Sequence, residues 1–188
     1  MRIKTDASLV MSSEKRLRRA QSSRYGAGRV LVLGLGNILF KDEGIGVHIA
    51  QRLQELALAD NVEVMDGGTA SLDVLLLAPG IEKLVVIDAL RAGKEAGTIY
   101  KARLKTEERD KLEQIFNGNS RISLHQIGLI DALTIAERMN CAPKEIAIIG
   151  IEPKKIDCGL ELTDEVKQRI PEIINTVLKE IEDAIHTE

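Results

Sequence analysis

The feature that most constrains the fold of this chain is the stretch Arg29–Val47, which reads RVLVLGLGNILFKDEGIGV. An apolar, β-branched run from Val30 to Leu33 leads into Gly34 and Gly36. This pattern indicates a buried strand that ends in a tight turn, and a helix is expected to follow the turn. The stretch therefore predicts the start of a βα unit of the kind that often binds nucleotides.

The same stretch lacks features that a nucleotide phosphate would need. A dinucleotide fingerprint places a third glycine at position 39, where this chain has Leu39. The start of the expected helix carries Asp42 and Glu43, which suit the helix dipole but repel a pyrophosphate. The sequence therefore favours a cation, a positively charged substrate group or acid–base chemistry. For Asp42 alone, a simple helix cap is an equally good interpretation.

Beyond Arg29 the chain alternates apolar, strand-like runs with segments of helical periodicity. This alternation predicts an α/β fold with three layers: a twisted, mostly parallel sheet of about five strands, flanked by helices on both faces. The expected strands are 30–33, 62–65, 84–87, 97–104 and 146–149, of which 97–104 has the alternation of a half-exposed, antiparallel edge strand. The expected helices are 44–58, one from Thr69 or Ser71 to Leu77, a short polar one that Thr106, Glu107 and Glu108 open, 126–139 and 163–186. Pro171 predicts a kink or a restart in the last helix.

Charge divides the chain into two parts. Residues 1–28 hold seven Lys or Arg against two acidic residues, a net charge of +5 that leaves −8 for the remainder. Residues 1–28 are therefore expected to form a basic, disordered arm, and 29–188 a single domain. A solvated tail is the favoured interpretation of the arm, over a segment that attracts an acidic partner or nucleic acid.

Composition narrows the class of protein. Cys141 and Cys158 lack CxxC spacing, which argues against a zinc knuckle or a redox pair and favours a reducing compartment, so we expect a cytoplasmic protein. No apolar run approaches the ~20 residues that a membrane span needs, so no membrane insertion is expected.

Polar residues follow three of the expected strands. Asn37 and Glu43 come after the first, Asp66 with Gly67, Gly68 and Thr69 after the second, and Asp88 directly after the third. In open α/β sheets the ligand crevice lies beyond the carboxyl ends of the strands. A single acid at a strand end is a common turn residue, but three such endings favour a functional site.

His125 supplies a nitrogen donor just before the expected helix 126–139. An isolated histidine in that position is more often bonded to backbone. With Glu43 and Asp88, however, it would form an O, O, N ligand set with open coordination positions, suited to Zn or Ni. Sequence separation alone does not show that the three residues meet.

The motifs resemble those of the maturation endopeptidases of nickel–iron hydrogenases. The resemblance covers most of the chain from Arg29 onwards and rests on GLGNILFKDEGIGV, DGGT at 66–69, DA at 88–89 and HQIGL at 125–129. It implies a twisted sheet flanked by helices. It also implies an endopeptidase that removes a C-terminal extension from the hydrogenase large-subunit precursor once nickel is inserted.

The resemblance further implies roles for individual residues. Glu43, Asp88 and His125 would contact the nickel that the precursor carries, and a divalent ion such as Zn or Cd is a candidate occupant in the free protein. Glu43 or Asp88 would be catalytic, in an aspartic-type or metal-assisted hydrolysis, and Asn37 and Asp66–Thr69 would line the site. The expected partner is the nickel-loaded precursor, with no DNA or RNA.

Two other classes of function stay open at this stage. A non-catalytic assembly chaperone would use the same ligands to sense nickel without cutting. A nucleotide-binding α/β enzyme is the alternative at the level of the fold, although Leu39, Asp42 and Glu43 argue against it.

Overall fold

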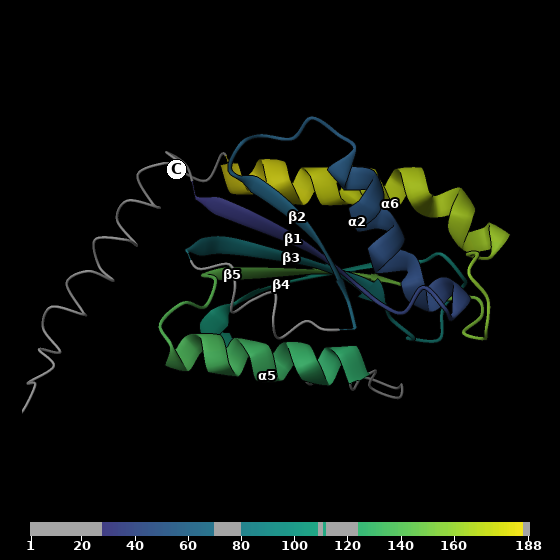
Figure 1. The fold of residues 1–188 in the computed structure, drawn as a ribbon, viewed down its shortest axis with the longest axis horizontal. Helices are drawn as coiled ribbons and strands as arrows, with labels where there is room; N and C mark the ends of the chain where they lie inside the picture. The colour runs from purple at the N-terminus through teal and green to yellow at the C-terminus, as the bar shows by residue number, and fades with distance from the viewer. Residues whose placement is uncertain (1–27, 70–79, 109–110, 112–123, 186–188) are drawn as a thin grey trace, which may run out of the picture.

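A computed structural model describes residues 28–69, 80–108, 111 and 124–185, with the backbone alone for 124–128 and 185. The chain folds into one five-stranded sheet between layers of helices (Figure 1). In chain order the elements are β1 (Arg29–Leu35), the 3-10 helix η1 (Lys41–Gly44), α2 (Ile45–Gln54), β2 (Val62–Gly68), β3 (Ile81–Ala89), β4 (Ile99–Lys105), the 3-10 helix η2 (Thr106–Glu108), α5 (Leu124–Arg138), β5 (Glu145–Ile151) and α6 (Asp164–Ile185).

The strands lie in the order β2-β1-β3-β5-β4. All neighbours are parallel except β4, which runs antiparallel to β5 at one edge of the sheet. The central strands β1, β3 and β5 are apolar along most of their length because both of their faces are covered. β4 is mostly half-buried or exposed, which confirms the predicted antiparallel edge strand.

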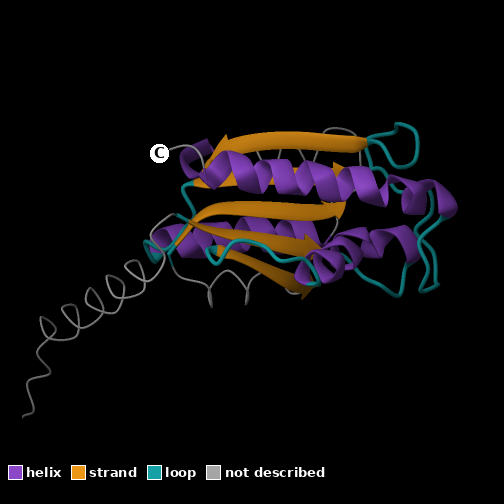
Figure 2. Cartoon of the chain, turned by 90° about the horizontal axis from the view of Figure 1, so that it is seen from above, coloured by secondary structure: helices purple, strands orange, loops and turns teal. Residues whose placement is uncertain are grey.

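Two hydrophobic clusters fill the space on either side of the sheet. One joins α5 to the sheet, and the other joins α2 and α6 to the opposite face. The strands twist between these helical layers, as Figure 2 shows from above. Alternate residues of β3 serve the two clusters: Leu84 and Val86 face α5, whereas Val85 and Ile87 face α2 and α6. The predicted three-layer fold is confirmed.

Several predicted boundaries differ from the structure. The first helix ends at Gln54 rather than at residue 58, and β2 runs on to Gly68, so Asp66, Gly67 and Gly68 belong to a strand and not to its exit loop. The restart predicted at Pro171 does not occur, because this exposed proline lies within one continuous helix. A proline removes one amide hydrogen bond, and on an exposed helix face water can hydrate the carbonyl that loses it. The helix expected to end at Leu77 lies outside the described residues.

The topology brings several connections to one edge of the sheet. β1, β2, β3 and β5 are parallel, so their carboxyl ends share an edge, which we call the carboxyl edge. The turn into η1 and the segments after β3 and β5 leave from there. α5 runs back across the sheet, so its first turn lies at the same edge (Figure 1).

Candidate active site at the carboxyl edge

The glycines of the β1–α2 connection allow helix and strands to touch. A Cβ atom on Gly34 would lie 2.2 Å from the Gly46 carbonyl oxygen, and one on Gly46 would lie 2.2 Å from the carbonyl oxygen of Ile87. Such distances exclude any side chain, so the first turn of α2 packs directly on β1 and β3. Gly36 has a φ of +129°, in the region that favours glycine. The glycines therefore serve helix–strand packing, and no phosphate is needed to explain them.

Glu43 lies in η1, directly before α2. Its amide donates to the Phe40 carbonyl over 3.2 Å, and its own carbonyl oxygen would be 1.9 Å from a Cβ on Gly36. The side chain is half-buried. Because η1 contacts β3 and Gly46 touches Ile87, the Glu43 backbone is held next to the carboxyl end of β3.

Asp88 lies inside β3, paired with Gly150 of β5, rather than just after the strand as predicted. It is 3% exposed, and its Oδ1 accepts the Ala89 amide over 2.8 Å. The alternation along β3 places Asp88 on the same face as Leu84 and Val86, which is the face that α5 covers. The strand is longer than predicted because β5 continues to pair with it as far as Ile151.

His125 occupies the first turn of α5, and only its backbone is described. That turn lies at the carboxyl edge, over the face to which Asp88 belongs (Figure 1). The structure therefore brings Glu43 and Asp88 onto contacting elements and places the His125 backbone at the same edge. Within the ranges that the structure describes, no three His, Cys, Asp or Glu side chains are grouped closely enough to hold a metal ion.

Asp42 is not the helix cap that one interpretation predicted, because the N-terminus of α2 has no side-chain cap. Its side chain is fully buried and accepts four hydrogen bonds from the segment after β5. Oδ2 accepts the amides of Lys154 (2.9 Å) and Lys155 (3.0 Å) and the Thr163 hydroxyl (2.8 Å), and Oδ1 accepts the Thr163 amide (2.7 Å). Asp42 therefore fastens η1 to residues 154–163 and is unavailable to a ligand.

The predicted site-lining residues take local structural roles. Asn37 Oδ1 accepts the Leu39 amide over 3.0 Å and so shapes the turn after β1. Asp66 accepts the Gly68 amide (3.0 Å) and the Gln51 side-chain amide (3.2 Å). Gly67 is buried against Leu33 and Leu35, Gly68 has a φ of +47°, and Thr69 is an exposed turn residue. Whether any of them also contacts substrate stays a prediction.

Sequence reasoning missed Glu152, which follows β5 directly. It is 5% exposed, and its Oε2 accepts the Tyr100 hydroxyl (2.5 Å) and the amides of Ala92 (2.8 Å) and Lys94 (3.3 Å). Burial opposes ionisation, but these hydrogen bonds outweigh it and hold the pKa of Glu152 below its ordinary value. The signal was present in the sequence, because Glu152 is an acid at a strand end just as Asp88 is.

His48 is a half-buried residue in the first turn of α2, close in the chain to Glu43. Burial, with a smaller effect from Arg52, holds the pKa of His48 below its ordinary value, although the Leu160 backbone and Asp66 favour the charged form. Its buried Nε2 has no hydrogen-bond partner among the described residues. Burial therefore favours the neutral imidazole of His48, and its hydrogen bond with the Leu160 backbone links α2 to the segment after β5.

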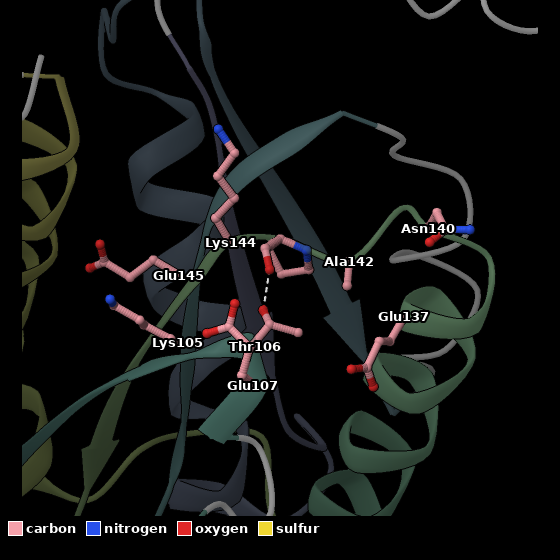
Figure 3. A pocket seen from close by; sticks show the side chains of 9 residues that line it. Lys105, Thr106, Glu107, Glu137, Asn140, Ala142, Lys144 and Glu145 are labelled. Carbon is pink, nitrogen blue, oxygen red and sulfur yellow. Dashed lines mark hydrogen bonds between the residues drawn. The ribbon is translucent and has the colours of Figure 1, made fainter.

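A surface pocket lies at the opposite edge of the sheet, where β4 ends and β5 begins (Figure 3). Thr106 donates its hydroxyl to the Pro143 carbonyl beside it, and charges of both signs surround it: Lys105, Glu107, Glu137, Lys144 and Glu145. Its position at the amino end of β5 separates this pocket from Glu43 and Asp88.

Comparison with known proteins decides the family. A family model described as hydrogenase maturation protease matches residues 47–180. The chain belongs to the hydrogenase maturation protease family. It is 37% identical over 155 residues to the hydrogenase expression/formation protein HupD of Rhizobium leguminosarum, covering 81% of this chain and 74% of HupD. It is also 37% identical over 152 residues to the hydrogenase 2 maturation protease of Escherichia coli, covering 80% of this chain and 88% of that protease.

Solved structures of hydrogenase maturation proteases share the fold. The endopeptidase HybD of Escherichia coli superposes with a TM-score of 0.72 at 32% identity, over 82% of this chain and 93% of HybD. HybD of Thermococcus kodakarensis superposes with a TM-score of 0.64 at 33% identity, over 81% of this chain and 98% of that HybD. The resemblance seen in the motifs is thus confirmed, and family membership makes the chain a hydrolase of the endopeptidase class.

Proposed function

We propose that this protein removes the C-terminal extension of a nickel–iron hydrogenase large-subunit precursor, in the cytoplasm, after nickel has been inserted. The observation that carries the proposal is the contact at the carboxyl edge between η1, which holds Glu43, and β3, which holds Asp88; the first turn of α5, with His125, lies at the same edge. Named relatives that are hydrogenase maturation proteases support it.

In this proposal the nickel carried by the precursor is the recognition element. Two carboxylates and an imidazole are donors that a borderline ion such as Ni accepts. Glu43, Asp88 and His125 would engage the ion while it stays bound to the precursor, so a precursor without nickel would present nothing for them to bind. Cleavage would then depend on the maturity of the precursor.

Glu43 or Asp88 would act as the general base for peptide hydrolysis, either alone or on a water polarised by the metal. A water oxygen attacks the carbonyl carbon of the scissile peptide, and the carboxylate takes the proton of that water. The C–N bond then breaks, and the proton passes to the leaving amine. The chain contains no GxSxG nucleophile motif.

The free protein would offer the same donor set to a resident ion such as Zn or Cd. Two carboxylates and an imidazole are donors that suit Zn, so the chemistry of this donor set fits such an ion. This ion would supply Lewis-acid polarisation of a carbonyl or a water when bound.

The test is incubation of the protein with purified precursor, with and without nickel, followed by intact-mass measurement. Wild-type protein should release a C-terminal peptide from the nickel-loaded precursor only. Glu43→Gln and Asp88→Asn should each slow this release by roughly 100-fold or more, because each removes a charged metal donor and one of the two also removes the general base. Glu161→Gln, an exposed acid at the same edge, is the matched control and should cleave normally.

Normal processing by both variants would contradict the assigned roles. Binding of nickel-loaded precursor without any loss of mass would instead indicate the assembly chaperone. The nucleotide-binding alternative is disfavoured because Leu39 stands where the fingerprint has its third glycine, and the acids Asp42 and Glu43 precede α2 where a phosphate would bind.

A further inference from the structure

Four exposed apolar side chains gather beside the candidate active site. Ile38 is 41% exposed, Leu39 57%, Phe40 36% and Leu160 64%. They are four of the seven large apolar side chains that are most exposed among the described residues. We call these four residues the apolar rim. Contiguous exposed apolar groups on a folded domain indicate an interaction surface.

The rim is continuous although it comes from two distant segments. Gly159 donates its amide to the Leu39 carbonyl over 2.9 Å, and the Lys41 amide donates to the Gly159 carbonyl over 2.8 Å. Phe40 and Gly159 form an isolated parallel bridge. Leu160 therefore lies next to the turn that carries the other three residues.

The backbone beneath the rim is held by buried contacts. Asp42 accepts its four hydrogen bonds directly below, and Lys41 has a φ of +50°, which is uncommon for a residue other than glycine. Gly159 has a φ of +149°, and a Cβ there would meet the Lys41 side chain at 2.8 Å. A surface ordered before binding loses little conformational entropy when a partner arrives.

Ile38, Leu39 and Phe40 of the rim belong to the same short turn as Glu43. The Glu43 amide bonds to the Phe40 carbonyl, and a Cβ on Gly44 would lie 2.8 Å from the Ile38 Cα. A folded protein whose metal reaches Glu43 must therefore cover the rim. We propose that the apolar rim is the docking surface for the folded large-subunit precursor, contacting apolar side chains that surround its nickel; this rests on the proposed function.

Charges around the rim agree with an apolar contact. The lysines around the rim lie near acids: Lys154 Nζ lies 3.5 Å from Glu165, Lys155 Nζ lies 3.1 Å from Asp157, and the charge of Lys41 also acts on Asp157. These pairs leave little uncompensated positive charge for an acidic peptide or a nucleic acid. An apolar centre within a polar border is the usual arrangement of a specific protein interface.

The first test replaces rim residues and measures processing kinetics. The double variant Leu39→Asp/Leu160→Asp should lower kcat/KM for nickel-loaded precursor by roughly 10-fold or more, through a higher KM with kcat nearly unchanged. Met139→Asp is the matched control, because Met139 is 55% exposed and lies beyond the end of α5, away from the carboxyl edge. Wild-type kcat/KM in the double variant would overturn the proposal.

The second test uses Cys158, an exposed thiol directly before Gly159, as a footprint. Nickel-loaded precursor in excess should slow the alkylation of Cys158 by a maleimide and leave that of Cys141 unchanged. Cys141 follows α5, and its thiol donates to the Ala136 carbonyl. Unaltered alkylation of Cys158 during active processing would refute docking on the rim. Protection of Cys158 without cleavage would refute the proposed function and keep the docking surface.

Discussion

At the scale of single residues, the neighbouring acids Asp42 and Glu43 differ in burial and in role. Asp42 is fully buried with four donors around its carboxylate, and Glu43 keeps a half-buried side chain on the surface of the same turn. The two are adjacent in a 3-10 helix, so their side chains leave it in different directions. One acid holds the turn in place, and the other is left for chemistry.

Asp42→Asn tests this division. An amide keeps the shape of the side chain but replaces one acceptor oxygen with an NH₂ group that faces N–H donors. The free energy of unfolding should fall by roughly 2 to 4 kcal/mol, measured by urea denaturation. Asp157→Asn changes an exposed acid of the same segment and should leave the urea midpoint unchanged. An equal midpoint for both variants would show that the buried carboxylate is not needed.

The role of Asp42 could not be read from the sequence, because its partners lie more than a hundred residues away. The Lys154 amide is 112 positions along the chain and the Thr163 amide 121 positions. The residues around Asp42 in the sequence indicated only two roles for it, a helix cap or a ligand. Glu43, Asp88 and His125 could be selected because each has donor chemistry near a predicted strand or helix end, but their spatial relation needed the sheet order.

At the scale of elements, the segment between β3 and β4 is held by one buried acid. The Leu90 amide donates to the Ile151 carbonyl, and the Gly97 amide donates to the Glu152 carbonyl. The Glu152 side chain accepts hydrogen bonds from the amides of Ala92 and Lys94. Tyr100 on β4 adds its hydroxyl to the same carboxylate oxygen. The segment that leaves β3 just after Asp88 is thereby fixed.

Tyr100→Phe should lower the free energy of unfolding by about 1 kcal/mol at pH 8. Burial and the adjacent Glu152 raise the pKa of Tyr100 from about 10 to about 12. Because the pKa is raised on folding, the stability due to this hydroxyl is fully present below pH 10 and is lost as the pH rises towards 12. The difference between wild type and variant should therefore shrink across that window in urea titrations.

Thr98→Val is the control for this window. It removes a hydroxyl that donates to the Glu95 carbonyl in the same segment, and it contains no titrating group. Its effect should be the same at pH 8 and at pH 11. The difference in the free energy of unfolding between wild type and Tyr100→Phe could also stay constant from pH 8 to pH 11. That result would show that the Tyr100 hydroxyl does not titrate as described.

The elements themselves were largely predictable. Apolar runs rich in Val, Ile and Leu identify β1, β3 and β5, and the shorter run Val62–Met65 identifies β2. The alternation over 97–104 identifies the edge strand, which pairs antiparallel with β5. Their ends were misjudged because pairing with neighbours, and not composition, decides where a strand stops. β2 continues to Gly68 because its pairing with β1 shifts register there, and the Gly36 amide bonds to the Gly68 carbonyl.

At the scale of the whole molecule, the carboxyl ends and the amino ends of the parallel strands have different roles. The carboxyl edge carries the candidate site, and a partly buried ion cluster lies towards the amino ends of β3 and β5. Lys83 Nζ lies 3.3 Å from Glu180 of α6 and 3.0 Å from Glu145, and Arg103 of β4 donates to both oxygens of Glu180 over 2.8 and 3.0 Å. Lys83 and Glu180 are buried, at 4% and 3% exposed, whereas the side chains of Glu145 and Arg103 stay in contact with water; the cluster joins α6 to β3 and β4.

Glu180→Gln should therefore destabilise the fold and leave the chemistry alone. Lys83 would remain buried with only partly exposed acids, Glu145 and Asp183, as anions nearby, which should lower the free energy of unfolding by about 3 kcal/mol in urea denaturation. Adding Lys83→Met removes the uncompensated charge, so the double variant should be more stable than Glu180→Gln alone. Because this cluster is remote from Glu43 and Asp88, kcat/KM for precursor should stay at the wild-type value in both variants below their unfolding temperatures. A loss of processing in the fully folded double variant would show that the two edges are coupled, since neither substituted residue lies at the carboxyl edge.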